Sequence, residues 1–130
     1  MNNTCPCGTE KLYENCCECF HLGKENPPSA ESLMRSRYTA YVVKNENYLL
    51  ETWHKSKRPK TLNLKDQNIN WLGLKILRIE AGAKNDDIGK VEFIAEFKIS
   101  SKHGKLHEIS NFVKENSKWF YVDGKIINDE

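Results

Sequence analysis

Hydrophobic residues along this chain change their spacing near its middle, which predicts helices first and strands afterwards. From Ser29, a suitable N-cap, hydrophobic side chains recur every three or four residues as far as about Val43. A second, shorter helix is expected from Asn47 to about Trp53, and Pro59 prevents it from continuing. Two helices are therefore expected before the strands begin.

Alternation of hydrophobic and polar side chains marks the later part of the chain. Every odd position from Val91 to Ile99 is hydrophobic, and three of the four even positions between them are charged, as in a half-buried antiparallel strand. Further strands are expected over residues 71–79, 106–114 and 118–123, with turns at 82–89, 103–104 and 115–117. Helices followed by hairpin-linked strands predict an α+β domain, with the helices packed on a curved antiparallel sheet.

Composition limits the classes of protein that fit this pattern. The 130 residues are 38% hydrophobic and 29% charged, which describes a folded domain with room for a small appendage. The segment from Gly23 to Pro28 is rich in glycine, proline and polar residues, so we place a boundary there, between an appendage at 1–23 and a domain at 29–127. A formal charge of +2 gives no support for a nucleic-acid partner. Because no hydrophobic run reaches the ~18 residues of a membrane span and polar residues follow Met1, we expect a cytoplasmic protein with no membrane contact.

Four of the five cysteines lie close together in the appendage, as Cys-Pro-Cys-Gly at 5–8 and Cys-Cys at 16–17. In a reducing compartment such a cluster favours metal binding over disulfides, and bridges within either pair would be strained. Four thiolates that bind zinc at ~2.3 Å place neighbouring sulfurs about 3.8 Å apart, which these short spacings allow. The proline and glycine predict a tight turn, and residues 9–15 are expected to form about two helical turns that lead into the second pair.

The spacing alone leaves the fourth ligand open. Adjacent residues of a helix point about 100° apart, so Cys16 and Cys17 can share one metal only where it sits at the end of the helix. Cys19 lies three residues after Cys16, on the same helical face, and could replace Cys17. His21 is a further potential donor. A thioredoxin-like redox site is disfavoured, because the Cys16–Cys19 spacing occurs without a βαβ context.

The cysteine pattern, with Tyr13 between its two halves, resembles the SEC-C motif. This short zinc-binding module occurs at the tail of the preprotein translocase motor ATPase and in many bacterial proteins. The resemblance implies that Cys5, Cys7, Cys16 and Cys17 hold one structural Zn²⁺ and that Cys19 is not a ligand. We expect the module to bind a protein partner.

The rest of the chain resembles the bacterial YchJ-like family in several blocks that occur in order. These blocks are Leu33-Met-Arg-Ser-Arg-Tyr38, Tyr48-Leu49, Thr52-Trp-His54, Trp71-Leu-Gly-Leu74, Phe112-Val-Lys-Glu-Asn116 and Trp119-Phe-Tyr-Val-Asp-Gly124. The resemblance implies an NTF2-like fold over 29–127, in which helices wrap round a bent sheet, and a homodimer through the sheet. Many members carry a second SEC-C motif after the Asp-Gly turn, whereas this sequence has no cysteine after Cys19.

An NTF2-like cone can hold a pocket at its open end, although in some members that end is packed shut. Polar and aromatic residues that could line such a pocket are Arg35, Arg37, Tyr38, Trp53, His54, Trp71, Glu108 and Tyr121. Each has a structural alternative: the aromatic residues could fill the core, His54 could be exposed, and a buried Glu108 would need a partner such as Arg35. Arg35 and Arg37 lie two residues apart on one helix, so at most one is expected to point inward.

Two functions follow from these features. A zinc ion with four sulfur ligands has no open position for substrate, which argues against a catalytic metal and favours a zinc-binding adaptor that presents its module to a protein. The alternative is a small-ligand-binding protein or enzyme that uses the cavity, with zinc serving structure only. No phosphate-binding loop, Ser-His-Asp arrangement or His-Glu-x-x-His pattern is present, so we predict no catalytic residue and no cofactor besides zinc.

Overall fold

The computed structural model of the chain describes residues 4–127. The helical elements are η1 (Tyr13–Asn15), α1 (Cys17–His21), α2 (Ala30–Val42), α3 (Glu46–Glu51) and η2 (Leu64–Asp66). The strands are β1 (Ile69–Ala81), β2 (Ile88–Ile99), β3 (Lys102–Glu115) and β4 (Lys118–Ile126), which form one antiparallel sheet in the order β1-β2-β3-β4. The expected α+β class, with helices preceding hairpin-linked strands, is confirmed.

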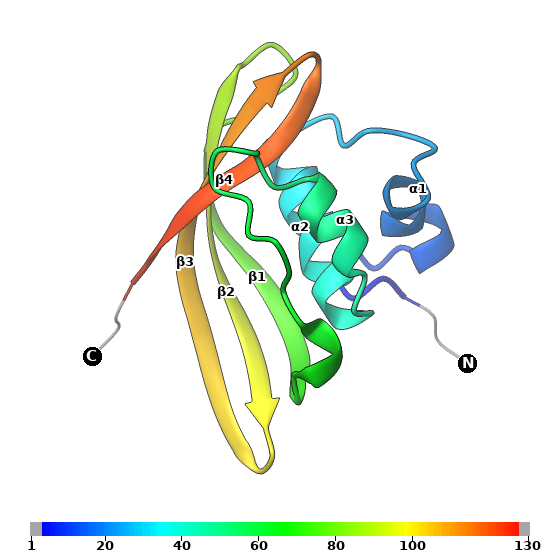
Figure 1. Cartoon of the computed structure of the whole chain (residues 1–130), viewed down its shortest axis with the longest axis vertical. Coiled ribbons are helices and arrows are strands. Elements are labelled where there is room, and N and C mark those ends of the chain that lie inside the picture. The colour runs from blue at the N-terminus through cyan, green and yellow to red at the C-terminus, as the bar shows by residue number, and fades with distance from the viewer. Residues whose placement is uncertain (1–3, 128–130) are drawn as a thin grey trace.

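Helices α2 and α3 lie between the sheet and the N-terminal segment that contains η1 and α1 (Figure 1). Register shifts in β1, and between Asn111 and Phe112 where β3 pairs with β4, help to bend the sheet round the helices. The main core fills the space between α2 and the concave face of the sheet. Its buried residues are Ala30, Leu33, Met34, Tyr38, Val91, Phe93, Ala95, Phe112 and Trp119.

Helix α2 begins where the sequence predicted. The Ser29 hydroxyl accepts a hydrogen bond from the Ser32 backbone N–H at 3.1 Å, and the Ser32 hydroxyl accepts one from the Ser29 backbone N–H at 3.0 Å. This reciprocal capping box satisfies two N–H groups that a helix terminus leaves unpaired. The Ala30 N–H also donates to the carbonyl of Gly82, at 3.0 Å, which ties the start of the helix to the β1–β2 hairpin.

Two local predictions were wrong. Residues 9–15 form only the 3₁₀ turn at 13–15, because Glu10 has a left-handed φ of 68° and Leu12 forms a β-bridge with Thr4. The β2–β3 turn lies at 100–101, and Gly104 is inside β3, opposite Phe97. A Cβ on Gly104 would lie 2.5 Å from the Phe97 ring, so this glycine permits a close approach between strands rather than a turn.

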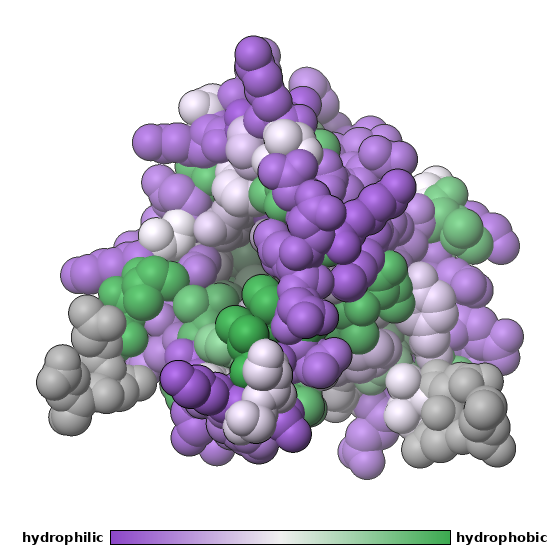
Figure 2. Space-filling model, turned by 60° about the horizontal axis from the view of Figure 1, so that its bottom comes forward, coloured by the Kyte–Doolittle hydropathy of each residue, from purple (hydrophilic) through white to green (hydrophobic). Residues whose placement is uncertain are grey.

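None of the helices in the described part of the chain is long and apolar enough to cross a bilayer. The surface seen in Figure 2 is largely hydrophilic, and its hydrophobic residues gather round a recess near the centre of that view.

Candidate metal centre and cavity

The first cysteine pair is placed by a tight turn. The Gly8 N–H donates to the Cys5 carbonyl at 3.3 Å, and Gly8 has a φ of 91°, a conformation that glycine adopts without the steric penalty of a side chain. The Cys5 N–H donates to the Lys11 carbonyl at 2.7 Å and closes the loop that follows. Cys5 and Cys7 therefore project from a fixed backbone.

The second pair sits at the start of α1. Cys16 is the N-cap and Cys17 is the first helical residue. Both side chains therefore lie at a helix end, which is where adjacent cysteines can share one metal. The Cys16 sulfur lies 3.6 Å from that of Cys7 and 4.0 Å from that of Cys17. All four sulfur atoms, including that of Cys5, lie within 4.8 Å of one another. These separations approach the ~3.8 Å expected between neighbouring ligands of a tetrahedral zinc.

The two alternative donors are engaged elsewhere. The Cys19 thiol donates to the Cys16 carbonyl at 3.0 Å. The His21 ring contacts the Tyr13 hydroxyl through Nδ1 and the Ser36 carbonyl through Nε2, both at 2.8 Å. The structure therefore brings together Cys5, Cys7, Cys16 and Cys17 and leaves Cys19 and His21 outside the cluster.

The close packing of the sulfurs makes the thiols compete for protons. Hydrogen bonds from Cys17 and Cys7 lower the pKa of the Cys5 thiol, whereas the neighbouring Cys5 and Cys7 sulfurs, together with burial, raise the pKa of the Cys17 thiol. Cys5, Cys7 and Cys17 are each less than 5% exposed. A divalent cation would replace the shared protons and neutralise charge that water cannot reach, so the donor set suits a soft metal such as zinc.

The cysteine module is attached to α2 through polar contacts. The Arg35 guanidinium donates to the Cys7 carbonyl and bonds the Glu31 carboxylate at 2.9 Å. The Cys5 sulfur lies 3.6 Å from the Thr39 hydroxyl. Arg35, a sequence candidate for the cavity, therefore faces the module instead, and it is not the partner of Glu108.

A cavity of about 190 Å³ lies between α2 and the concave face of the sheet. Five of the candidates from the sequence line it: Arg37, Tyr38, Trp71, Glu108 and Tyr121. The remaining lining residues, which the sequence did not single out, are Met34, Tyr41, Phe93, Ala95, Leu106 and Ser110. Most of the wall is therefore aromatic or aliphatic, with a few polar groups among it, as in many small-molecule sites.

Arg37 is the arginine that points inward, in agreement with the expectation that at most one of Arg35 and Arg37 would do so. It occupies the same helical stripe as Leu33, Tyr38 and Tyr41, and this spacing accounts for its direction. Its side chain is buried, and its Nη1 donates to the Leu49 carbonyl at 2.8 Å and to a threonine hydroxyl in the segment after α3.

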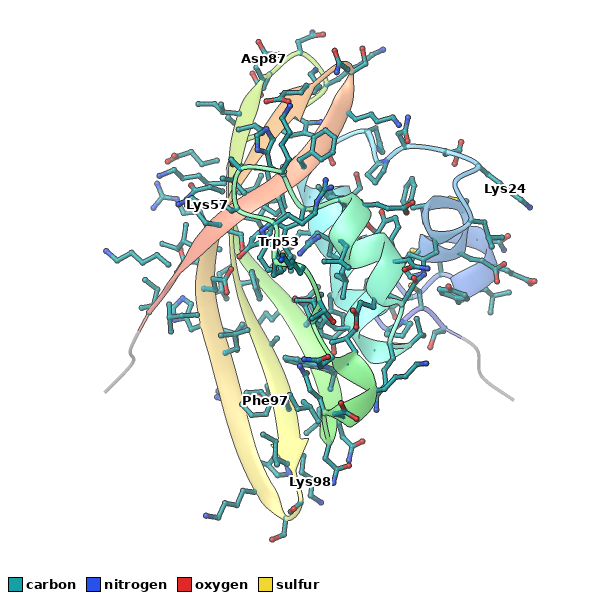
Figure 3. All side chains as sticks on the ribbon, in the orientation of Figure 1. Lys24, Trp53, Lys57, Asp87, Phe97 and Lys98 are labelled. Carbon is teal, nitrogen blue, oxygen red and sulfur yellow. The ribbon has the colours of Figure 1, made fainter. Side chains whose placement is uncertain are left out.

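Trp53 and His54 lie outside the cavity. Trp53 sits between α3 and β4 (Figure 3), with its ring 5.0 Å from that of Tyr121. The His54 backbone N–H donates to the Tyr121 carbonyl at 2.7 Å, so this segment runs along β4. The imidazole does not line the cavity, and its Nε2 lies 2.7 Å from Oε2 of Glu115. His54 and Glu108 therefore do not form an acid–base pair.

The comparisons with known proteins agree with this architecture. Residues 29–124 match the family described as YchJ, middle NTF2-like domain, and residues 1–18 match the SEC-C motif. A UPF0225 protein of Bordetella pertussis is 45% identical over 125 residues, which cover 94% of this chain and 92% of the relative. A UPF0225 protein of Streptomyces coelicolor is 43% identical over 124 residues, which cover 95% of this chain and 96% of the relative.

Two solved structures share the fold along nearly the whole chain. The solution structure of a SEC-C motif containing protein from Rhodopseudomonas palustris superposes with a TM-score of 0.84 at 30% identity, covering 98% of this chain and 100% of that one. The crystal structure of a SEC-C motif containing protein from Psychrobacter arcticus superposes with a TM-score of 0.77 at 27% identity. The match covers 98% of this chain and 84% of that one. The chain therefore belongs to the YchJ-like family, with a SEC-C motif followed by an NTF2-like domain.

Proposed function

We propose that Cys5, Cys7, Cys16 and Cys17 bind one structural Zn²⁺, and that the protein is a cytoplasmic adaptor which presents the zinc-stabilised module to a protein partner. The observation that carries the metal assignment is the cluster of four sulfurs within 4.8 Å of one another. Four sulfur ligands complete the tetrahedron of zinc, so the metal has no position left for substrate. Its contribution is then to folding.

The module depends on this metal because it has little other core. Among the described residues, the buried members of its own cluster are Cys5, Cys7 and Cys17, and the partly buried Tyr13 and Cys16 pack against them. A segment of this size cannot bury enough apolar surface to fold alone, and metal binding supplies the missing free energy.

The module contacts α2, and its exposed side chains support the adaptor proposal. Leu12 and Leu22 are 41% and 60% exposed. Glu14 and Lys24 are exposed in the same short segment. Exposed hydrophobic side chains with charged neighbours offer the kind of surface that a protein partner can bury.

Zinc analysis of purified variants tests the metal assignment. Cys16→Ser and Cys17→Ser are expected to lose stoichiometric zinc, because each removes one corner of the tetrahedron. Cys19→Ser is the matched control and is expected to keep one zinc per chain, because its sulfur faces the Cys16 carbonyl. Zinc lost from Cys19→Ser and retained by Cys17→Ser would contradict the assignment.

Affinity capture with the same proteins tests the adaptor function. A partner retained by the wild type and by Cys19→Ser, and lost with Cys16→Ser, is the expected result. Capture that is equal for all three proteins contradicts a role for the zinc module in binding.

The cavity supports a second function, the binding of a small ligand, with zinc serving structure only. The observation that favours it is the buried Arg37, which lines the cavity and forms no ion pair with an acid among residues 4–127. Buried charges in proteins are ordinarily paired, so an unpaired one at a cavity indicates a place for an anion.

A further inference from the structure

Arg37 presents unused hydrogen-bond donors to the cavity. It is 3% exposed, its hydrogen bonds to Leu49 and Thr52 both use Nη1, and its guanidinium also interacts with the Tyr41 side chain. The guanidinium carries five N–H groups in a planar fork, so Nε and Nη2 remain available. The fork lies against the rings of Trp53 and Tyr121, 5.1 and 4.5 Å from their centroids, which fixes its plane.

The tyrosines near Arg37 do not supply its counter-charge. Burial raises the pKa of Tyr41 and also raises that of Tyr121, so both hydroxyls stay neutral at physiological pH. The guanidinium itself remains charged, because arginine does not deprotonate in proteins. The cavity therefore has a fixed positive charge on its α2 side.

Glu108 provides a fixed acceptor on the sheet side of the same cavity. Its Oε2 accepts hydrogen bonds from the Ser110 hydroxyl at 2.7 Å and the Tyr121 hydroxyl at 3.2 Å. A Cβ at Gly124 would lie 2.0 Å from this oxygen, so the glycine on β4 makes room for the carboxylate. The hydrogen bonds of the described residues leave Oε1 unused.

Arg37 and Glu108 line one cavity without joining in an ion pair, since no contact of 4.0 Å or less between them occurs in residues 4–127. The wall of the same cavity includes the aromatic residues Tyr38, Trp71 and Phe93. The space of about 190 Å³ equals that of about six waters at ~30 Å³ each, which suits a single ring with short substituents.

We propose that this cavity binds a small aromatic carboxylate that also carries a hydrogen-bond donor. The ligand's carboxylate bonds the Arg37 fork, its donor bonds Glu108, and its ring packs against the aromatic wall. The ligand needs the hydrogen-bond donor as well as the carboxylate. A carboxylate ligand without a donor would place its negative charge in the same cavity as the Glu108 carboxylate and form no hydrogen bond with it. This proposal rests on the ligand-binding function inferred for the cavity.

Calorimetric titration of the zinc-loaded full chain with three probes tests the proposal. The probes are 4-hydroxybenzoate, benzoate, which lacks the donor, and 4-hydroxybenzyl alcohol, which lacks the anion. We expect 4-hydroxybenzoate to bind, and each of the other two to bind about tenfold more weakly, because benzoate offers no donor to Glu108 and the alcohol offers no anion to Arg37. Tryptophan fluorescence that changes in the wild type and not in Trp71→Phe reports contact with Trp71.

The outcomes separate this proposal from the function on which it rests. Equal affinity for the three probes would leave a ligand-binding cavity but overturn the roles of Arg37 and Glu108. No binding of any probe at ~1 mM would overturn both the ligand class and the ligand-binding function, while the zinc assignment would stand on its own measurement.

A variant of Arg37 adds a test from the protein side. Arg37→Gln is expected to bind 4-hydroxybenzoate and 4-hydroxybenzyl alcohol with affinities that differ by less than about twofold, because the charge that distinguishes them is gone. Arg78→Gln, which alters an arginine with an exposed side chain on β1, is the control and is expected to keep the tenfold preference. If Arg37→Gln still prefers 4-hydroxybenzoate tenfold, the assignment of Arg37 as the carboxylate-binding residue is overturned. If Arg37→Gln does not fold, the comparison of the three probes on the wild type decides the question.

Discussion

Arg35 and Arg37 leave α2 in different directions and bind different parts of the molecule. Arg35 donates to the Cys7 carbonyl on the side of the zinc module, and Arg37 reaches the cavity and the end of α3. Two residues along a helix differ by about 200° in direction, which accounts for this separation. Replacement of either arginine therefore perturbs a different site of the protein.

His21 links the module to the domain through a fixed tautomer. Its Nε2 lies 2.8 Å from the Ser36 carbonyl, which can only accept, so Nε2 carries the proton. Its Nδ1 then accepts a hydrogen bond from the Tyr13 hydroxyl at 2.8 Å. The centroid of the His21 ring also lies 4.7 Å from that of the Tyr48 ring, and His21 is half-buried.

We predict that His21 titrates below the ordinary value of 6.5, because burial lowers its pKa. The folded protein binds this proton more weakly than the unfolded chain does. Its stability is therefore unaffected by His21 above about pH 6.5 and decreases as the pH falls from there toward the folded pKa. Imidazole resonances followed by NMR in the zinc-loaded protein measure this pKa, with the denatured chain as the reference. A midpoint at or above 6.5 would contradict the prediction.

At the scale of elements, the β1–β2 hairpin and the start of α2 depend on a close backbone approach. Gly82 accepts the N–H of Ala30, and Gly89 lies directly beside Gly82. A Cβ on Gly89 would lie 2.6 Å from the Gly82 Cα and 3.1 Å from the Ala30 Cβ. Only a residue without a side chain permits this contact.

Gly89→Ala is expected to lower the free energy of unfolding by about 1–3 kcal/mol, since backbone atoms must move to admit the methyl group. Gly73→Ala, also in a strand but with no atom within 4 Å of the added Cβ, is the matched control. It is expected to stay within about 0.5 kcal/mol of the wild type. Urea denaturation of the two variants measures both values, and equal effects would show that the close approach does not limit stability.

The elements that could be predicted from the sequence are those with a regular pattern. Helix α2 has both a capping residue and hydrophobic spacing, and β2 has strict alternation. The position of Gly104 could not be predicted, because a glycine that lets Phe97 lie across a neighbouring strand looks in sequence like a glycine in a turn. Helical propensity also predicted a helix over 9–15 that does not form, because the loop after the first cysteine pair places Glu10 in a left-handed conformation.

The same reasoning applies to the two candidate sites. The cysteines are close in sequence, so their spacing alone indicated a shared metal. The cavity assembles residues from α2, β1, β2, β3 and β4, and its polar groups come from positions whose direction depends on tertiary packing. Glu108, for example, has polar Ser110 beside it on the inner face of β3, which conceals the alternation that would have oriented it.

At the scale of the whole molecule, the hydrophobic contacts fall into separate clusters. The main core joins α2 to the sheet, a second cluster lies round Tyr48 and Leu49, and the cysteines form a third. The cysteine module therefore has a cluster of its own, which is separate from the core between α2 and the sheet.

Removal of zinc with a chelator is expected to abolish amide-exchange protection within residues 4–22 while β2 and β3 remain protected. The physical reason is that the metal replaces the core of the module, whereas the sheet is stabilised by burial elsewhere. Hydrogen exchange measured before and after chelation, with Cys19→Ser as a zinc-retaining control, tests this. Loss of protection across the sheet would show that the two parts fold as one unit.

Helix α2 has a further consequence, because it touches both sites. The carbonyl of Ser36 and the side chains of Arg35 and Thr39 meet the module, while Arg37 lines the cavity one helical step away. Thermodynamic linkage makes any influence through this helix reciprocal. If metal loading alters the affinity for an organic ligand by some factor, occupancy by that ligand must alter zinc affinity by the same factor, and the cell's zinc supply would then be coupled to the concentration of a metabolite.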